Sequence, residues 1–303
     1  MTASIIVPTY NGASKITSLL NALVTQTYKD FEVIIVIDGS TDHTYETVNI
    51  YQSKFQHIKI IQQENSGRAA SRNAGAREAK GNIIIFLDDD IVPLDNLVEL
   101  HIRHHQNLPG SMIVGKNFMD IRGNRNDFYS YRYSIEQKWN PYYPDELKPV
   151  TFEDYRFTSS NLSLSKSLFF SLNGFEEQLR DSEDFDFSIR ALLKNVPIYY
   201  DQNIFGWHCD FVDLEGYLKR QKEYKHSKIF LLNLHPEYYS LSPANFNISQ
   251  GRINIFKKII SKFFIYNIYW KQVLQSKFFL KLVPGKIRFK LYELIIYSST
   301  LHD

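Results

Sequence analysis

Three adjacent aspartates, Asp88, Asp89 and Asp90, stand directly after the apolar run Ile83–Leu87. Carboxylate oxygens are hard ligands for Mg²⁺ or Mn²⁺, and such an ion can bridge a diphosphate and neutralise a leaving group. Three neighbouring carboxylates also repel one another, and the sequence offers no other obvious counter-charge, so we expect a cation beside them. On its own, such a triplet is more often a solvated acidic turn that caps the next helix.

A second acidic pair, Glu183 and Asp184, begins a predicted helix over Glu183–Lys194. A carboxylate in a site can remove the proton of an acceptor hydroxyl as that oxygen attacks a carbon. Acidic residues are also common at helix starts, because they stabilise the helix dipole. The pair alone therefore leaves a catalytic and a structural interpretation open.

Two arginines, Arg68 and Arg72, lie four residues apart and share one face near the start of a predicted helix over Ser66–Ala79. Cationic side chains and the free amides of a first helical turn can bind phosphate together. A surface or packing role suits Arg72 about equally well. Arg68 is the stronger candidate for a phosphate ligand.

The elements that must position these residues alternate over the first 110 residues between β-branched runs and helical patterns, which predicts parallel βαβ units with right-handed crossovers. They are Ser4–Val7, Ile16–Leu23, Phe31–Ile37, His43–Phe55, Ile58–Gln62, Ser66–Ala79, Ile83–Leu87 and Leu94–His105. Ligands of such sheets bind beyond the carboxyl ends of the strands. Polar groups follow all four strands there, namely Thr9-Tyr10-Asn11, Asp38-Gly39-Ser40, Glu64-Asn65 and Asp88-Asp89-Asp90. We therefore expect four segments to converge on one rim.

The second part of the chain is less periodic. Residues 118–157 are rich in Gly, Asn, Pro and Tyr, which indicates long loops with room for one short helix. Order resumes with strands over Ser160–Ser165 and Val196–Tyr200 and with helices over Lys166–Leu172, Glu183–Lys194 and about Leu214–Leu232. A basic, aromatic tail follows.

Composition limits the function classes. With 44% hydrophobic and 22% charged residues among 303, the chain resembles an ordinary globular protein, neither disordered nor polytopic in a membrane. Its net charge is +2, but residues 251–303 hold ten Lys or Arg against two acids, which leaves 25 basic against 31 acidic residues in 1–250. This asymmetry argues against nucleic-acid binding by the main domain and favours an anionic partner for the tail.

Cys209 is the single cysteine, so an intrachain disulfide and a cysteine metal cage are excluded, and a reducing, cytoplasmic setting fits best. The buried-strand pattern Ser4–Val7 stands where a signal peptide would have its charged leader, so we expect no such peptide.

The most apolar later stretch, Ile253–Trp270, contains three lysines and is not expected to cross a membrane. Over Ile253–Phe264 its polar and apolar residues fall on opposite helical faces, an interfacial pattern. We expect the tail to bind an anionic membrane surface peripherally, on the inner face of the cell membrane, with help from Phe278, Phe279, Lys281, Lys286, Arg288 and Lys290. Packing of the same aromatic residues onto the main domain, or into a homodimer interface, stays open as an alternative.

Four motifs in order resemble those of the family 2 glycosyltransferases. They are Ile6-Val7-Pro8-Thr9-Tyr10-Asn11, Val36-Ile37-Asp38-Gly39-Ser40-Thr41-Asp42, Ser66-Gly67-Arg68-Ala69-Ala70-Ser71-Arg72-Asn73 and Phe86-Leu87-Asp88-Asp89-Asp90. The resemblance covers about residues 3–210. It implies an α/β fold of GT-A type, a Rossmann-like, mostly parallel sheet flanked by helices. It also implies inverting, Mn²⁺- or Mg²⁺-dependent transfer of a sugar from a nucleotide diphosphate donor, with UDP favoured, to a glycan or lipid-linked acceptor in cell-surface polysaccharide synthesis.

The resemblance also implies roles for single residues. Asp88 and Asp90 frame the metal and ribose contacts and Asp89 shares them, as in the family's D-x-D motif. Asp38 accepts a hydrogen bond from the base, with the loop Pro8-Thr9-Tyr10 beside it. His208 completes the metal shell, although a lone histidine is more often structural.

For the acceptor side, the resemblance makes Asp184 the catalytic base, with Glu183 orienting the acceptor or its loop, after a turn at Asn173-Gly174-Phe175. The expected domains are a catalytic domain over 1–212, divided into a nucleotide-sugar half (1–110) and an acceptor half (111–212), and a helical C-terminal extension over 213–303. The three histidines His101, His104 and His105 have helical spacing and indicate a polar helix face rather than a metal site.

Two other classes compete with this interpretation. A sugar-1-phosphate nucleotidylyltransferase needs a Gly-rich, Arg-containing loop after the first strand, and a dinucleotide oxidoreductase needs G-x-G-x-x-G there, whereas the chain has Pro8-Thr9-Tyr10-Asn11-Gly12. A catalytically inactive sugar-binding or scaffolding protein of the same fold would not need the acidic triplet, Asp38 and the Glu183-Asp184 pair together.

Overall fold

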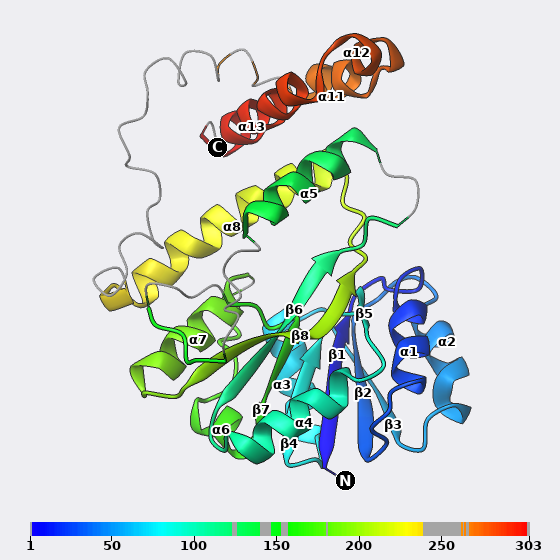
Figure 1. The fold of residues 1–303 in the computed structure, drawn as a ribbon, viewed down its shortest axis with the longest axis vertical. Helices are drawn as coiled ribbons and strands as arrows, with labels where there is room; N and C mark the ends of the chain where they lie inside the picture. Colours follow the sequence, from blue (N-terminus) through cyan, green and yellow to red (C-terminus); the bar gives the residue numbers. More distant parts are fainter. Residues whose placement is uncertain are drawn as a thin grey trace. The chain divides into compact units, whose positions relative to one another are not determined.

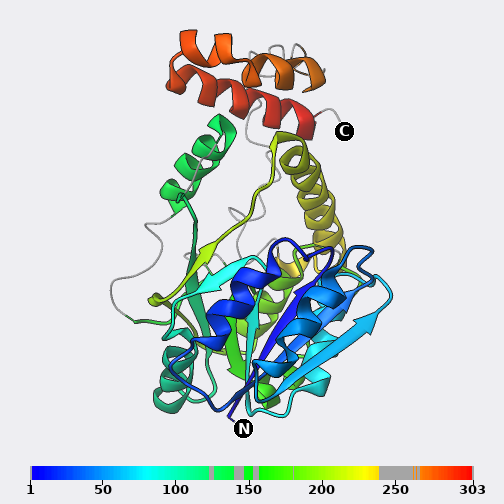
Figure 2. The same ribbon diagram turned by 90° about the vertical axis from the view of Figure 1, so that its right-hand side faces the viewer.

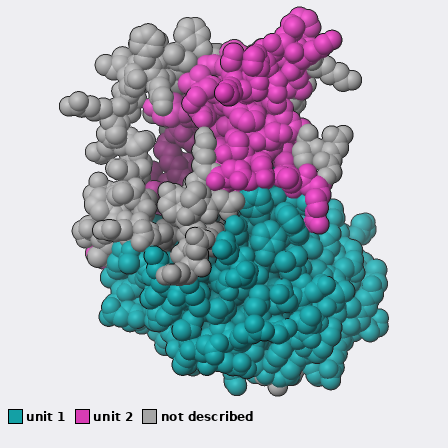
Figure 3. Space-filling model, viewed as in Figure 1, with its two compact units in different colours: residues 1–120, 140–210 teal, residues 121–139, 211–303 magenta. Residues whose placement is uncertain are grey.

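The structure is a computed structural model that describes residues 2–122, 126–139, 147–152, 157–179, 181–238 and 267–301, together with Lys262 and Phe264. The chain divides into two compact units (Figure 3). Unit 1 comprises residues 1–120 and 140–210, and unit 2 comprises residues 121–139 and 211–303. Residues 121–139, which lie inside the domain expected from the sequence, thus group with the C-terminal segment.

Unit 1 is built on an eight-stranded sheet with the order β3-β2-β1-β4-β7-β6-β8-β5. Its strands are β1 (Ala3–Thr9), β2 (Phe31–Asp38), β3 (Ile58–Gln63), β4 (Ile83–Leu87), β5 (Ile91–Pro93), β6 (Met112–Met119), β7 (Asn161–Ser165) and β8 (Ile198–His208). Strands β3, β2, β1 and β4 run parallel to one another. Strand β7 runs antiparallel to β4 and β6, and β6 and β8 are parallel. The predicted α/β class is confirmed.

Helices cover both faces of the sheet (Figures 1 and 2). One face packs against α1 (Ile16–Val24), α2 (Thr44–Asn49) and α4 (Leu97–Asn107), and the other against α3 (Arg68–Glu78), α6 (Lys166–Ser171) and α7 (Glu183–Leu193). Side chains of a strand alternate between the faces, so Ile35 joins the first core and Ile34 the second. Burial on both faces explains the uniformly apolar sequence of β2.

Two features that the sequence patterns do not predict bring the acidic residues after β4 close to the end of β8. The predicted strand Val196–Tyr200 is the start of a longer strand: its register to β6 jumps between Gly115 and Lys116, where the partner changes from Asp201 to Phe205. The polar residues that suggest a strand end therefore sit in a bulge. The short strand β5 pairs Ile91 with His208.

The predicted polar face of α4 is wrong for His101, which is fully buried against β7. Its Nε2 lies 2.9 Å from Asn161 Oδ1 and its Nδ1 2.7 Å from Ser163 Oγ. Burial lowers the pKa of His101 to about 3 and, with the charge of His104, that of His105 to about 4. The hydrogen bonds of His101 and His105 to Asn161 and Ser163 fasten the helix to the sheet.

Unit 2 contains α5 (Asp127–Trp139), α8 (Leu214–Leu234), α11 (Asn267–Gln275), α12 (Lys277–Leu282) and α13 (Gly285–Leu301). Its core joins Phe128 of α5 to Tyr292 of α13, with ring centroids 5.1 Å apart. Arg288 Nη2 lies 2.7 Å from Asp127 Oδ1, so this partly buried cation is paired within unit 2.

Most of the predicted amphipathic stretch Ile253–Phe264 lies outside the described residues. Within them, Phe264 is buried, with its ring 4.5 Å from that of Trp270. The other described apolar side chains of the tail include an exposed set on α11, α12 and the start of α13: Tyr269, Val273, Phe278, Leu282 and Ile287. Across the described parts of the chain, helices long and apolar enough to span a membrane are absent.

Candidate active site

The loops after β1 and β2 are joined at the carboxyl end of the sheet. Asn11 Oδ1 accepts a hydrogen bond from Thr41 N at 2.8 Å, and Asn11 N donates to Ser40 Oγ at 3.0 Å. Asn11 has a φ of 47°, a left-handed conformation that asparagine tolerates better than most residues. The predicted convergence of the first two segments is therefore present.

Asp38 fixes the third segment to the same rim. It is buried, and its carboxylate accepts hydrogen bonds from Gln63 Nε2, Ser66 N and Gly67 N at 2.8, 2.8 and 2.9 Å. The following Gly39 has a φ of 69°, and a Cβ there would lie 2.6 Å from Asn65 N. Asp38 thus stabilises the loop that leads into α3, and Asp38-Gly39 forms a turn. The carboxylate oxygens of Asp38 still have lone pairs for a further hydrogen-bond donor.

The acidic triplet is not short of protein counter-charges, contrary to the expectation from the sequence. Each aspartate has its own cationic or imidazole partner, and each partner comes from a different part of the chain. Asp88 Oδ1 lies 2.6 Å from Arg72 Nη2, Asp89 Oδ1 lies 2.8 Å from Lys15 Nζ, and Asp90 Oδ1 lies 3.6 Å from His208 Nε2. These partners are 16 or more positions away in sequence, so a search of the neighbouring residues misses them.

Asp89 points into the protein. It is buried and also accepts a hydrogen bond from Thr9 Oγ1 at 2.6 Å. Burial raises the pKa of Asp89 to about 6, although Lys15 acts in the opposite direction. Thr9 is buried by the same contact, while Pro8 is partly buried and Tyr10 is half exposed at the rim. Lys15 is a site residue that the sequence analysis missed, and its position just after the Asn11-Gly12 turn is the only local signal.

Asp90 and His208 form the pair whose chemistry suits a divalent cation. A carboxylate oxygen and an imidazole nitrogen are both accepted by Mn²⁺ or Mg²⁺, with further oxygens supplied by a diphosphate. Burial tends to lower the pKa of His208, but the nearby Asp90 carboxylate outweighs this effect, and the pKa is raised. Within the described ranges there is no group of three or more His, Cys, Asp or Glu residues that could hold a metal ion.

The two arginines occupy different environments. Arg68 is half exposed, with Nη1 4.0 Å from Asp181 Oδ1. Arg72 is buried: its Nη2 donates to Asp88 and its Nη1 donates to Glu183 Oε1, also at 2.6 Å. Arg72 therefore connects the acidic triplet to the acidic pair.

The acidic pair begins α7 as predicted. Glu183 is buried on Arg72, whereas Asp184 is half-buried and accepts a hydrogen bond from Phe185 N at 2.7 Å. Burial and then the Glu183 charge raise the pKa of Asp184 to about 7, with Arg72 opposing them. Ser182, just before the pair, has a φ of 66°, a strained conformation for a residue with a side chain. A carboxylate with a pKa near 7 is suited to accept a proton at neutral pH.

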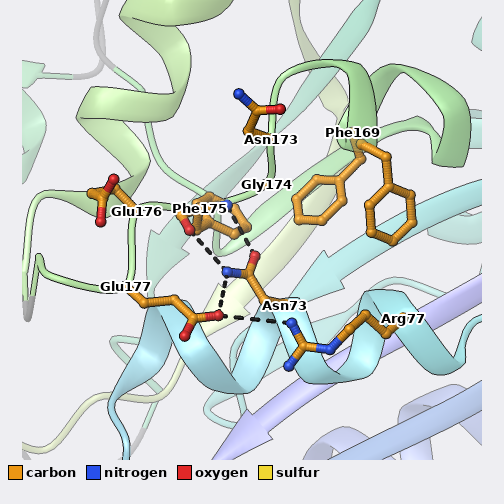
Figure 4. Close-up of a pocket in the computed structure, with 9 residues that line it drawn as sticks. Asn73, Arg77, Phe169, Asn173, Gly174, Phe175, Glu176 and Glu177 are labelled. Atoms are coloured by element: carbon orange, nitrogen blue, oxygen red, sulfur yellow. Dashed lines mark hydrogen bonds and ion pairs between the residues drawn. The ribbon is translucent and has the colours of Figure 1, made fainter.

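The turn before the acidic pair is fastened to α3 (Figure 4). Asn73 Oδ1 accepts a hydrogen bond from Phe175 N, and Asn73 Nδ2 donates to Phe175 O and to Glu177 Oε1. Arg77 Nη1 lies 3.7 Å from the same Glu177 oxygen. An open pocket of about 480 Å³ lies over these residues and over Phe169 and Gly174. These contacts fasten the turn to α3.

Comparisons with known proteins match the sequence motifs. The model of the family described as "Glycosyl transferase family 2" matches residues 4–170. The chain is 30% identical over 209 residues to the uncharacterized glycosyltransferase YfnE of Bacillus subtilis, which covers 69% of this chain and 50% of that protein. The chain thus spans half the length of this relative.

Two solved structures share the fold. TarS of S. aureus, residues 1–349 in complex with UDP, has a TM-score of 0.57 at 22% identity, covering 99% of this chain and 89% of that one. The mannosyltransferase PcManGT of Pyrobaculum calidifontis, in complex with GDP-Man and Mn²⁺, has a TM-score of 0.62 at 15% identity, covering 98% and 85%. The likeness confirms a GT-A fold.

Proposed function

Since this chain belongs to glycosyl transferase family 2, we propose that it moves a sugar from a nucleoside diphosphate, UDP in the first instance, to a hydroxyl group of a glycan or lipid-linked acceptor with inversion at the anomeric carbon. The observation that carries the proposal is the half-buried carboxylate of Asp184, whose pKa is raised to about 7 and which begins α7 beside the buried Glu183. Such a group is a base at neutral pH.

In the proposed reaction Asp184 accepts the proton of the acceptor hydroxyl. The acceptor oxygen forms a bond to the anomeric carbon as the bond from that carbon to the diphosphate oxygen breaks, and the electron pair leaves with the nucleoside diphosphate. One displacement of this kind inverts the anomeric configuration. The reaction needs a proton acceptor on the side opposite the leaving group, which is the role assigned to Asp184.

The donor is proposed to bind along the rim between the first three strand ends. Asp38, at the end of β2, would accept a hydrogen bond from the uracil imino group, with Tyr10 beside the base. Arg68, half exposed near the start of α3, is the proposed phosphate ligand. TarS binds UDP and UDP-GlcNAc and PcManGT binds GDP-Man, which supports a nucleotide-sugar donor without selecting the sugar.

Asp90 and His208 are the residues proposed to hold Mn²⁺ or Mg²⁺. When bound there, the ion would neutralise charge on the departing diphosphate. Asp88, which the D-x-D resemblance also assigns to the metal and ribose, keeps one carboxylate oxygen on Arg72, so its proposed part is the ribose contact.

We further propose that the exposed apolar set of unit 2 lies on an anionic lipid surface on the cytoplasmic side, where a lipid-linked acceptor and a cell-surface glycan would be assembled. Phe278 and Leu282 are spaced by one helical turn of α12 and are 77% and 61% exposed. Lys281 and Lys286 beside them are exposed, and α11 and α12 contain no acidic residue. Exposed aromatic and basic side chains together suit an anionic interface.

A thermal-shift panel tests the proposed function. Sugars linked to UDP, GDP or another nucleoside diphosphate are each added with Mn²⁺ or with Mg²⁺, and the melting temperature is measured. Binding to the folded state raises this temperature. We expect a UDP-sugar with metal to give the largest shift. An inactive scaffold would also bind a nucleotide sugar, but it would not release the nucleoside diphosphate. The absence of any shift across the panel would contradict the proposal.

A further inference from the structure

Arg72 differs from a phosphate ligand in its surroundings. Its side chain is 3% exposed, against 51% for Arg68 one turn earlier on α3. Both terminal nitrogens of its guanidinium are bonded to carboxylates, and the remaining Nε is buried without a hydrogen-bond partner. The guanidinium also lies over the Phe175 ring, 5.6 Å from its centroid. Few directions are left from which a donor phosphate could reach it.

We propose that Arg72 is a positioning residue that holds Asp88, on the donor side, and the Glu183-Asp184 helix start, on the acceptor side, in one fixed arrangement. This inference rests on the proposed function, and it replaces the phosphate role that the sequence suggests for Arg72. Asp88 directly follows β4, Glu183 begins α7, and Arg72 lies on a third element, α3.

The neighbouring contacts make this connection rigid. The next residue on α3, Asn73, holds both the N–H and the carbonyl of Phe175 (Figure 4). Arg190 of α7 also holds this turn by donating to Gly174 O at 2.8 Å. The Arg72 guanidinium thus contacts the Phe175 ring, which these hydrogen bonds fix in place, and Glu183 at the start of α7. A displacement of α3 would move the donor and acceptor carboxylates together.

Arginine suits this role better than lysine. Its planar guanidinium presents separate N–H groups to two carboxylates at once, whereas an ammonium is a single point of charge on a flexible chain. Arg72 also supplies a positive charge near Asp184, opposing the carboxylates of Glu183 and Asp181 that raise the pKa of Asp184. Geometry and charge can therefore be separated by choosing the replacement.

The experiment compares Arg72→Lys and Arg72→Gln with the wild type and with Arg77→Gln. Arg77 is a matched control because it lies on the same helix and also pairs with a carboxylate, Glu177, but at the surface. Each full-length variant is assayed for kcat against pH with UDP-GlcNAc, or with the donor that the wild type turns over. UDP affinity in Mn²⁺ is measured by calorimetry, and melting temperature reports the fold.

Arg72→Lys is expected to lose about a hundredfold in kcat, the cost of a displacement of about 1 Å, while UDP affinity and the pH at which kcat rises stay near those of the wild type. Arg72→Gln is expected to lose kcat too and to move that rise to higher pH, because a cation near Asp184 is gone. Arg77→Gln should match the wild type. If Arg72→Gln does not fold, the lysine variant decides. If that variant also unfolds, Glu183→Gln should lose kcat and move the rise to lower pH.

The inference would be overturned if folded Arg72 variants, or Glu183→Gln where that variant decides, kept the wild-type kcat and pH dependence. It would also be overturned if a fall in UDP affinity accounted for the whole loss of activity in the Arg72 variants. A wild type that turns over no nucleotide sugar would instead overturn the proposed function, and the positioning role with it. An active wild type with unaffected variants leaves the function standing and removes only the role of Arg72.

Discussion

Arg72 Nη1 lies 2.6 Å from Glu183 Oε1, although 111 positions separate the two residues in the sequence. The same guanidinium reaches Asp88 at the end of β4. The acidic triplet and the acidic pair are therefore parts of one charged network in unit 1. A substitution in either motif is therefore expected to affect the other through Arg72.

The pH dependence of kcat should follow Asp184. The pKa of this carboxyl is raised to about 7 by burial and by Glu183, and only the deprotonated form can accept a proton. We expect kcat to rise with pH up to about 7, by about tenfold per pH unit on the acidic side, and then to level off. Steady-state rates at saturating donor between pH 5 and 9 check this. A rate that stays constant down to pH 5 would exclude a base with such a pKa.

Metal removal should abolish donor turnover without unfolding the protein. We expect full loss of activity in EDTA, recovery with Mn²⁺, and a higher Mn²⁺ requirement for Asp90→Ala, because this variant removes one of the two proposed ligands. Asp201→Ala is the matched control, since Asp201 also contacts a histidine, His104, at 2.6 Å, but on the helix-packed part of the sheet. Full activity of the wild type in excess EDTA would contradict the metal requirement.

The buried His101 of α4 should make stability depend on pH. His101 is held neutral in the native state with a pKa of about 3, while its unfolded pKa is about 6.5. Its contribution is complete above pH 6.5 and is lost as pH falls from there toward 3, because only the unfolded state takes up the proton.

Urea unfolding at several pH values between 7.5 and 5 measures this effect. We expect the free energy of unfolding to fall by up to about 1.4 kcal/mol per pH unit for His101, and His101→Gln should flatten the dependence. His43→Gln, at a side chain that is 92% exposed, serves as the control. An equal slope in the wild type and in His101→Gln would show that His101 carries no such linkage.

Sequence patterns predict the first half of the fold well, because β1 to β4 and their helices are local and strongly periodic. The short strand β5 and the long strand β8 escape them, because three residues give little periodicity and the polar bulge after Tyr200 imitates a strand end. The same bulge brings His208 to Asp90. Motif resemblance names candidate residues but not their partners: Lys15 and Arg72 pair with the triplet only once the sheet has assembled.

The exposed apolar set of unit 2 should bind anionic vesicles in a salt-sensitive way. In flotation assays we expect Phe278→Ser with Leu282→Ser, and separately Lys281→Glu, to weaken binding to anionic vesicles, with little binding of any variant to neutral ones. Ile50→Ser, at an apolar residue of unit 1 that is 65% exposed, is the control. A wild type that stays unbound at low salt would contradict the proposal, and a dimer disrupted by the Phe278 and Leu282 changes would assign the surface to a second copy.

Asp184→Asn separates binding from chemistry and tests the central claim most directly. The change removes the proton acceptor but keeps the size of the side chain at the start of α7. We expect the affinity for UDP and Mn²⁺ to match that of the wild type and the transfer rate to fall at least about a hundredfold, with Asp181→Asn as the neighbouring control. An Asp184→Asn protein that transfers sugar at the wild-type rate would contradict the account.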